Sequence, residues 1–146
     1  CIGIDISTER IDRANRKRDR ARLPNLHFIQ AEARLFLDAL PMGITFSDIY
    51  VLFPDPWPKV KHRKNRLINE RFPALAARAL RPGGVVYLRT DHVEYFEQML
   101  AGFRAETNFS EVEAPAALAA VTTDFEREFN TQGIPTNRCA WRMRDA

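Results

Sequence analysis

Two kinds of hydrophobic pattern alternate along the 146 residues of the chain. Short apolar or β-branched runs are typical of strands, and apolar positions at helical spacing are typical of amphipathic helices. The pattern predicts strands at residues 2–6, 26–30, 46–53, 85–89, 109–112 and 136–143. It predicts helices at residues 8–22, 31–40, 69–80, 92–104 and 123–132. Strands joined through helices favour right-handed crossovers, so we expect an α/β fold with a doubly wound, mostly parallel sheet.

Some local signals refine this pattern. The alternation ends in two strands near the C-terminus, which predicts an antiparallel edge pair. A proline loop, residues 54–58, and a basic segment, residues 59–66, follow the third strand. We expect neither to form a helix or a central strand, because three prolines in five residues remove amide donors. Asn69 is expected to cap the next helix, with Pro73 in its first turn. The run Pro82-Gly83-Gly84 is expected to separate that helix from the strand at 85–89.

Composition narrows the class of protein. The hydrophobic fraction is 45% and the charged fraction 28%, which is typical of a globular protein and argues against a disordered or fibrous chain. The longest apolar runs fall far short of the roughly 20 residues that span a bilayer, so a membrane-embedded protein is excluded. The length fits a single domain over residues 1–146. The two cysteines, Cys1 and Cys139, lack zinc or redox spacing, and we expect a cytoplasmic protein.

Basic residues fall in two clusters, although the net charge is only +3. Residues 10–22 mix arginines and a lysine with Asp12 and Asp19, and we interpret them as a solvated helix face. The basic segment contains no acidic residue; its basic members are Lys59, Lys61, Arg63, Lys64 and Arg66. Without compensating acids it sets a positive potential that a phosphate backbone feels within about 8 Å. The basic segment is therefore the better candidate for binding nucleic acid.

Four acidic residues lie where the ligand of such a sheet is expected. They follow four strands in succession and are Asp5, Glu32, Asp55 and Asp91. Ligands of open α/β sheets bind outside the carboxyl ends of the strands. Asp5 fits the residue that accepts ribose hydroxyls of a nucleotide, and Glu32 is placed for the adenine end. Taken singly, each is better explained as a helix-dipole or turn residue, but the fold does not require all four.

The proline loop combines a carboxylate with an aromatic ring. Prolines on both sides of Asp55 restrict the backbone, which lowers the entropic cost of holding Asp55 and Trp57 in one geometry. A flat ring, a fixed carboxylate and a neighbouring basic segment are what binding an unstacked nucleobase requires. The alternative is a structural loop in which Trp57 is a core residue and Asp55 belongs to a turn.

Three runs of sequence resemble the bacterial tRNA (guanine-N7)-methyltransferase family. They are FPDPWPKVKHRKNRL at residues 53–67, LRPGGVVYLRTD at residues 80–91 and TTDFEREF at residues 122–129. The resemblance covers almost the whole chain, and the proline loop is its most specific part. It implies a Rossmann-like class I methyltransferase fold that uses S-adenosylmethionine to methylate N7 of a guanine in the tRNA variable loop.

The resemblance also implies roles for individual residues. Asp5 would bind the ribose of the cofactor, Glu32 would lie near its adenine, and Asp55 would lie between cofactor and substrate. The residues implied to contact the tRNA are Lys59, Asp91, Thr123, Asp124, Phe125 and Glu126. Apart from the resemblance, Thr123 and Glu126 also satisfy a helix capping box, which is a structural role.

The expected chemistry fits these residue types. Guanine N7 has a free lone pair and can attack a sulfonium methyl group without first losing a proton, so no strong general base is needed. Positive charge develops on the purine during transfer, and we expect the Asp55 carboxylate to orient the base and stabilise that charge. His27, His62 and His92 lack metal-ligand spacing, and no metal is expected.

The position of Asp5 bears on the N-terminus. If Asp5 ends a second strand, a first strand, a glycine-rich loop and a first helix should precede Cys1. Together these three elements take roughly 30 residues, so we expect an N-terminally incomplete fold. Two alternatives stay open. One is a non-catalytic RNA-binding module that has lost cofactor binding. The other is a methyltransferase acting on an exocyclic amine, whose Asp/Asn-Pro-Pro-aromatic motif has one proline more than Asp55-Pro56-Trp57.

Overall fold

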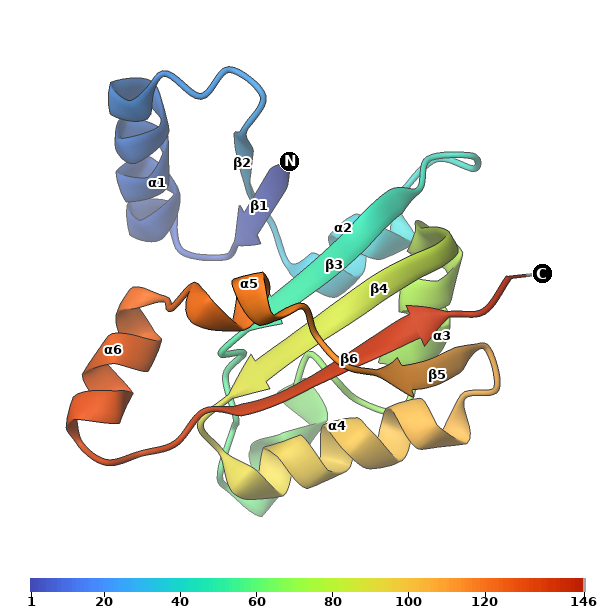
Figure 1. Ribbon diagram of the computed structural model, residues 1–146. Coiled ribbons are helices and arrows are strands. Elements are labelled where there is room, and N and C mark those ends of the chain that lie inside the picture. Colours follow the sequence, from blue (N-terminus) through green and yellow to red (C-terminus); the bar gives the residue numbers. More distant parts are fainter. Residues whose placement is uncertain (146) are drawn as a thin grey trace. The chain divides into compact units, whose positions relative to one another are not determined.

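The computed structural model describes residues 1–145 of the chain (Figure 1). Its internal contacts divide it into two compact units, Cys1–Pro41 and Met42–Ala146, called here the N-unit and the C-unit. Each unit has its own sheet. None of the helices in residues 1–145 has the length and apolar character needed to cross a membrane. The single domain expected over residues 1–146 stays a prediction.

The N-unit consists of two strands and two helices. In chain order they are β1 (Ile2–Asp5), α1 (Thr8–Ala21), β2 (His27–Gln30) and α2 (Ala33–Asp38). β1 and β2 are parallel, with Asp5 opposite Gln30, and α1 provides the crossover that a parallel pair needs. Gly3 allows this packing, because a Cβ there would lie 2.6 Å from the Phe28 ring. All four predicted elements of this unit are confirmed to within a few residues.

The C-unit is built around a four-stranded sheet. Its elements are β3 (Phe46–Leu52), the 3₁₀-helix η1 (Val60–Asn65), α3 (Phe72–Ala79), β4 (Leu80–Thr90), α4 (Val93–Ala105), β5 (Phe109–Val112), α5 (Ala116–Ala120), α6 (Asp124–Thr131) and β6 (Asn137–Met143). The strand order is β3-β4-β6-β5. β3 and β4 are parallel, and β6 is antiparallel to both of its neighbours. The α/β class and the antiparallel C-terminal pair are confirmed, with β5 at the edge.

The core of the C-unit lies where α3 and α4 pack on the sheet. Val86, Tyr95 and Phe103 are completely buried. Phe103 stacks on Trp141 of β6, with ring centroids 5.4 Å apart, and meets Phe109 of β5 edge-on at 5.1 Å. Burial of such side chains contributes about 1.5–3 kcal/mol each. This core therefore fixes β4, the strand from whose carboxyl end the site described below extends.

Two expectations for the segment before the core are wrong. The basic segment forms η1 instead of an irregular loop, because η1 begins at Val60, two residues after Pro58, and so keeps its amide donors. α3 begins at Phe72 and not at Asn69. The Asn69 side chain does not cap α3, because its Oδ1 accepts the N–H of Arg71 at 3.0 Å in the preceding turn.

β4 also differs from expectation. It begins at Leu80 and includes Pro82-Gly83-Gly84, which were expected to separate helix and strand. The register with β3 shifts between Phe46 and Asp48, and such an irregularity tolerates a proline within a strand. A Cβ on Gly84 would lie 2.7 Å from the Ser47 carbonyl oxygen, so the close approach of the two backbones requires glycine. The short helix α5 was not predicted.

Cys139 lies on β6 beside the core. Its Sγ accepts a hydrogen bond from Trp141 Nε1 at 3.4 Å. Burial raises the pKa of the Cys139 thiol to about 11. The thiol therefore stays protonated near neutral pH and packs as a small apolar side chain. Cys1 and Cys139 are both free cysteines.

Candidate functional site

The proline loop leaves the carboxyl end of β3 with its carboxylate exposed. Asp55 Oδ1 accepts the N–H of Trp57 at 3.0 Å, an Asx-turn that holds the carboxylate beside its own backbone. Phe53 and Trp57 both have positive φ, 53° and 41°. Each non-glycine residue in this region carries a strain of about 1–2 kcal/mol. Trp57 is only half-buried, and its ring meets the His62 ring edge-on at 5.8 Å, so it is not a core residue.

Arg66 anchors the proline loop to α4. Its side chain is completely buried, and its Nε donates to the carbonyl oxygen of Pro56 at 2.7 Å. Its Nη1 donates to Gln98 and to Glu94 of α4, and its guanidinium lies 4.7 Å from the centroid of the Tyr95 ring. The sequence placed Arg66 on a basic surface, but it is an internal clamp between the loop and α4. The one sequence signal is that Leu67 and Ile68, both apolar, follow it directly.

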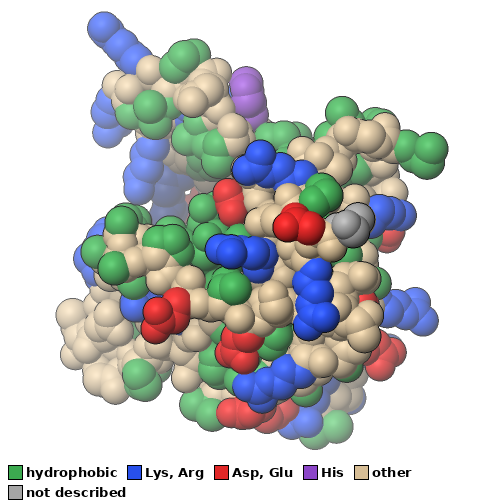
Figure 2. Space-filling model, turned by 45° about the vertical axis from the view of Figure 1, so that its right-hand side comes forward, with side chains coloured by type: hydrophobic (Ala, Val, Ile, Leu, Met, Phe, Trp, Pro, Cys, Tyr) green, Lys and Arg blue, Asp and Glu red, His purple; other side chains and the backbone are tan. Residues whose placement is uncertain are grey.

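The remaining basic segment divides into paired and unpaired side chains. Arg63 Nη2 lies 2.7 Å from Glu94 Oε2, so α4 supplies the acid that the segment lacks. Lys59, Lys61 and Lys64 are exposed, and no ion pair to them is found within residues 1–145. Over the face drawn in Figure 2, Lys and Arg side chains alternate with Asp and Glu. Pairing, and not the number of basic residues, therefore decides which of them can meet a phosphate.

Asp91 follows β4 at the same edge of the sheet as the proline loop. β3 and β4 are parallel with Leu52 opposite Arg89, and the N–H of Phe53 donates to the Arg89 carbonyl oxygen at 2.8 Å. Thr90 is completely buried, and its Oγ1 accepts the N–H of His92 at 3.2 Å. The half-buried Asp91 lies between these two residues. The structure thus brings the proline loop and Asp91 to one edge, as the sequence predicted.

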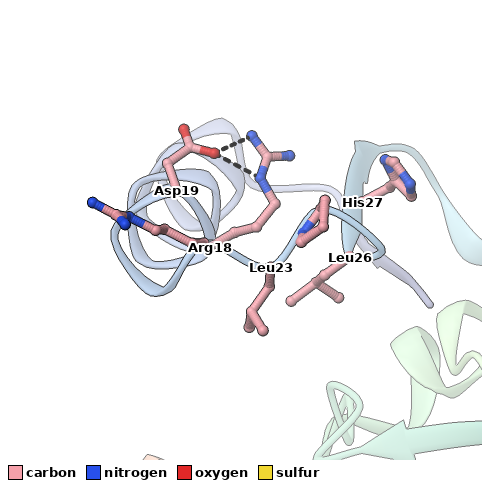
Figure 3. A pocket seen from close by; sticks show the side chains of 7 residues that line it. Arg18, Asp19, Leu23, Leu26 and His27 are labelled. Atoms are coloured by element: carbon pink, nitrogen blue, oxygen red, sulfur yellow. Dashed lines mark hydrogen bonds and ion pairs between the residues drawn. The ribbon is translucent and has the colours of Figure 1, made fainter.

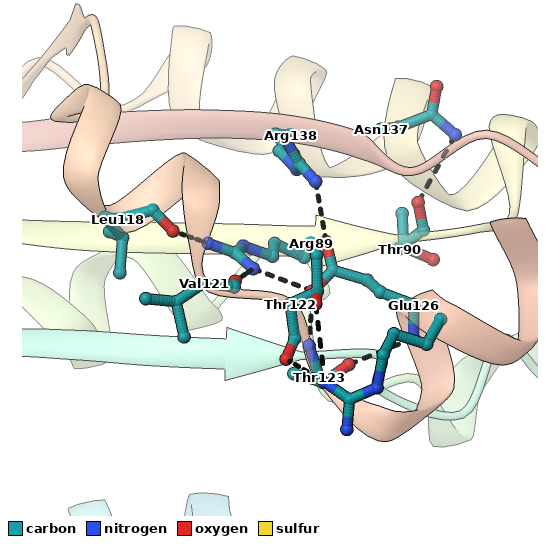
Figure 4. A network of polar contacts seen from close by, with 10 residues as sticks. Arg89, Thr90, Leu118, Val121, Thr122, Thr123, Glu126, Asn137 and Arg138 are labelled. Atoms are coloured by element: carbon teal, nitrogen blue, oxygen red, sulfur yellow. Dashed lines mark hydrogen bonds and ion pairs between the residues drawn. The ribbon is translucent and has the colours of Figure 1, made fainter.

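The segment Thr123–Glu126 begins α6 with the predicted capping box. Thr123 Oγ1 accepts the N–H of Glu126 at 3.1 Å, and Glu126 Oε2 accepts the N–H of Thr123 at 2.9 Å. Glu126 is completely buried and also accepts from Arg89 at 2.7 Å and from Arg138 at 2.8 Å (Figure 4). Burial alone would raise the pKa of Glu126, but the Thr123 amide and the two guanidinium groups outweigh it and hold the pKa below its ordinary value.

Arg89 is a second internal clamp. It is almost fully buried, and besides Glu126 it donates to the carbonyl oxygens of Val121 and Leu118 at 2.7 and 2.6 Å (Figure 4). These two carbonyls belong to the segment that leads into α6. The C-unit therefore uses a buried arginine for two of the predicted substrate segments: Arg66 for the proline loop and Arg89 for the start of α6. Neither role was predicted from the sequence.

An aromatic contact joins these two segments. The Phe53 ring lies 6.3 Å from the Phe125 ring and 6.0 Å from the Phe129 ring, measured between centroids. Phe125 is 47% exposed, and Asp124 is exposed and paired with Arg127. Within this segment, Asp124 and Phe125 are exposed, whereas Glu126 is completely buried. The roles of Thr123, Asp124, Phe125 and Glu126 as substrate contacts stay predictions.

In the N-unit, Asp5 and Glu32 lie together at the carboxyl edge of β1 and β2. Asp5 Oδ1 accepts the N–H of Ser7 at 2.8 Å, and Oδ2 lies 3.3 Å from Arg10 Nη1. Glu32 caps α2, with its oxygens accepting the N–H groups of Arg34 and Leu35. Burial raises the pKa of Glu32, but these amides and the Arg34 guanidinium together bring it below its ordinary value. Asp5 keeps free acceptor capacity and a side chain 31% exposed, which fits a group that accepts ribose hydroxyls.

Two hollows open on the N-unit. The larger, about 530 Å³, lies at the C-terminal end of α1, where Arg18 pairs with Asp19 next to Leu23, Leu26 and His27 (Figure 3). It includes none of the predicted site residues. The smaller, about 200 Å³, lies between β1 and α1 and includes Asp5. Within residues 1–145, no group of three or more His, Cys, Asp or Glu side chains is arranged to hold a metal ion.

Two curated proteins of similar sequence carry the same name. A tRNA (guanine-N(7)-)-methyltransferase from Treponema pallidum subsp. pallidum is 35% identical over 132 residues, which is 90% of this chain and 53% of that protein. One from Thiobacillus denitrificans is 34% identical over 142 residues, covering 97% and 62%. The resemblance seen in the motifs is thus confirmed. The chain spans about half to three fifths of the length of these relatives.

Solved structures share the fold at low sequence identity. NSun6 from Pyrococcus horikoshii with SFG has a TM-score of 0.66 and 18% identity, covering 99% of this chain and 41% of that one. The N-methyltransferase NodS from Bradyrhizobium japonicum has a TM-score of 0.63 and 11% identity, covering 99% and 73%. The family model described as "Putative methyltransferase" matches residues 1–139. Because this match covers nearly the whole chain, the chain belongs to that methyltransferase family.

Proposed function

We propose that the protein transfers the methyl group of S-adenosylmethionine to N7 of a guanine in the variable loop of tRNA. One observation carries the proposal: the proline loop, Asp91 and the start of α6 extend from one edge of the sheet, and two buried arginines hold the outer segments there. The names of the sequence relatives support the same reaction and substrate. The proposed location of the protein is the cytoplasm.

The cofactor is proposed to bind through the N-unit carboxylates. Asp5 accepts the ribose hydroxyls, since within residues 1–145 its Oδ2 makes a single long contact, to Arg10. Glu32 lies near the adenine and acts mainly through the start of α2, because both of its oxygens are engaged there. When bound, S-adenosylmethionine supplies an activated methyl group on a sulfonium sulfur. The residues of this chain therefore need only to bind, orient and stabilise charge.

Asp55 is the proposed catalytic residue. Its carboxylate is exposed and is held by the Trp57 amide, so it is available to a base brought to the proline loop. Charge that develops on the purine is stabilised by a carboxylate already in place, without reorganisation during the reaction. Asp55 removes no proton, because N7 carries none. Arg66 is a positioning residue, since it reaches the loop through the carbonyl of Pro56.

The tRNA contacts are proposed to come from the exposed members of each segment. Lys59, together with Lys61 and Lys64, faces solvent and suits phosphate. Asp91 and the exposed pair Asp124 and Phe125 lie on segments held at the same edge of the sheet. Thr123 and Glu126 set the course of the backbone there through the capping box.

The test uses full-length protein, labelled S-adenosylmethionine and unmodified tRNA, with nucleoside mass spectrometry to identify the methylated atom. We expect 7-methylguanosine. Methylation of an exocyclic amine, or tRNA binding without cofactor binding, would contradict the proposal in favour of one of the two alternatives. Asp55→Asn keeps the Asx-turn acceptor and removes the charge, and it should lower kcat by about 100-fold. Asp12→Asn, which removes a charge on the exposed face of α1, should leave kcat unchanged.

A further inference from the structure

Helix α1 carries a stripe of basic side chains on the face turned away from its buried residue. Ile11 is the buried member of the helix. The stripe consists of Arg13, Arg16, Lys17 and Arg20, at the spacing i, i+3, i+4 and i+7 that puts side chains on one helix face. At 3.6 residues per turn this face lies opposite Ile11, and the stripe is about 10 Å long. All four residues are exposed.

The stripe concentrates the positive charge of the chain. Residues 8–22 contain seven basic and three acidic side chains, a net charge of +4, whereas the whole chain has +3. Glu9 neutralises Arg13 at 2.7 Å, and Asp19 pairs with Arg18, outside the stripe. No ion pair to Arg16 or Arg20 is found within residues 1–145.

This arrangement is unfavourable for the helix itself. Like charges four residues apart repel, as do Arg16 and Arg20. The helix dipole favours Arg20 in the last turn but gives no support to Arg16, which lies earlier. A solvated face chosen for stability would alternate the two signs along the stripe. A polyanion that neutralises both arginines accounts for charges that the fold does not use.

The side chains on the exposed face of α1 indicate which kind of polyanion it binds. A helix that binds a lipid surface needs a broad apolar face exposed beside its basic one, and the exposed face of α1 carries no large apolar side chain. Arginine forms two parallel hydrogen bonds to a phosphate, so a row of arginines suits a phosphate backbone.

We propose that the α1 stripe is a second tRNA-binding surface, which contacts the phosphate backbone without reading its sequence. The proposal rests on the proposed function, because tRNA is the polyanion that this function brings to the protein. The surface is distinct in its residues from the basic segment, whose lysines lie on the C-unit. It increases affinity for tRNA and takes no part in methyl transfer.

The test is the full-length variant Arg16→Gln with Arg20→Gln, since glutamine keeps the helix propensity of arginine. The matched control is Arg81→Gln with Arg144→Gln, which removes two exposed charges from the C-unit. For the α1 variant, tRNA affinity near 0.15 M salt should fall about tenfold, and the slope of log affinity against log salt should flatten by about 1.4–1.8, the value for two lost phosphate contacts. KM for tRNA should rise while kcat at saturating tRNA and the melting temperature do not fall.

The outcomes separate this proposal from the one on which it rests. An α1 variant that binds tRNA with the affinity and salt slope of the control overturns the stripe while leaving the methyltransferase function intact. A wild-type protein that binds tRNA through the stripe but transfers no methyl overturns the function alone. Vesicles of anionic lipid serve as a second probe. If the α1 substitutions abolish vesicle binding and leave tRNA binding unchanged, the stripe is a membrane surface and the proposal is wrong.

Discussion

The C-unit buries two of its arginines, whereas the N-unit buries none. In the C-unit, Arg66 and Arg89 are buried and donate to the backbone carbonyls of loops. In the N-unit, every arginine is at least partly exposed, and those of the α1 stripe point away from the buried side of the helix. The difference depends on whether a partner exists: Glu94 and Glu126 receive the C-unit arginines, and Arg16 and Arg20 have no such partner in the described chain. A basic side chain that is paired within the fold supports the site, whereas an unpaired one is available to a ligand.

The largest expected effect comes from breaking the Arg89 clamp. Glu126→Ala leaves a buried guanidinium without its counter-charge and should lower the free energy of unfolding by about 3–5 kcal/mol, measured by urea denaturation. Asp124→Ala, on the same helix but at an exposed ion pair, should cost less than about 1 kcal/mol. Equal losses in the two variants would show that burial of Glu126 does not set its importance.

The next effect tests the Arg66 clamp. Arg66→Ala removes the donor to Pro56 and leaves a cavity beside Tyr95, and it should destabilise the protein by about 2–3 kcal/mol. Arg63→Ala, whose ion pair with the same Glu94 is half-exposed, should cost about 0–1 kcal/mol. Arg66→Lys separates packing from positioning, because it keeps the charge but loses the forked donor geometry. We expect it to lower kcat more than it changes KM for tRNA.

Substitution of the lysines of the basic segment should affect tRNA binding, as for the α1 stripe, and not stability, as for Arg66. The double variant Lys61→Gln with Lys64→Gln should weaken tRNA binding by roughly tenfold and flatten the salt slope, with no change in the urea midpoint. A drop in stability with unchanged binding would place these lysines with the internal arginines and contradict the comparison.

The smallest effect is in pH dependence. The pKa of Glu126 is held below its ordinary value of 4.5, so its contribution to stability is complete above that pH and is lost as the pH falls through the lowered pKa. Acid unfolding of Glu126→Gln should therefore be less steep than that of the wild type. Glu32→Gln should flatten the same part of the curve, because the pKa of Glu32 is also lowered. An unchanged acid limb in both variants would contradict these assignments.

Most of the fold was predictable because its signals are local. The strands β1, β3 and β5, the capping box at Thr123 and the acidic residues after the first four strands all follow from neighbouring residues. The inward orientation of the Arg66 side chain could not be predicted from neighbouring residues. Its partner Glu94 is 28 residues further along the chain, and the sequence does not distinguish a buried arginine from an exposed one. The inclusion of Pro82 in β4 was missed for a similar reason, since the register shift that accommodates it depends on β3. The proline loop was recognised as a site, but the clamps that hold it were not.

The partly buried thiol of Cys139 provides a way to follow opening of the strand that anchors α6. With a pKa of about 11, only about one thiol in ten thousand is ionised at pH 7, and alkylating reagents react with the thiolate. Cys139 adjoins Arg138, which holds Glu126, so opening of this part of β6 should increase the reactivity of the partly buried thiol. Its rate of alkylation in the native protein, measured by mass spectrometry, therefore reports local opening of the strand that anchors α6.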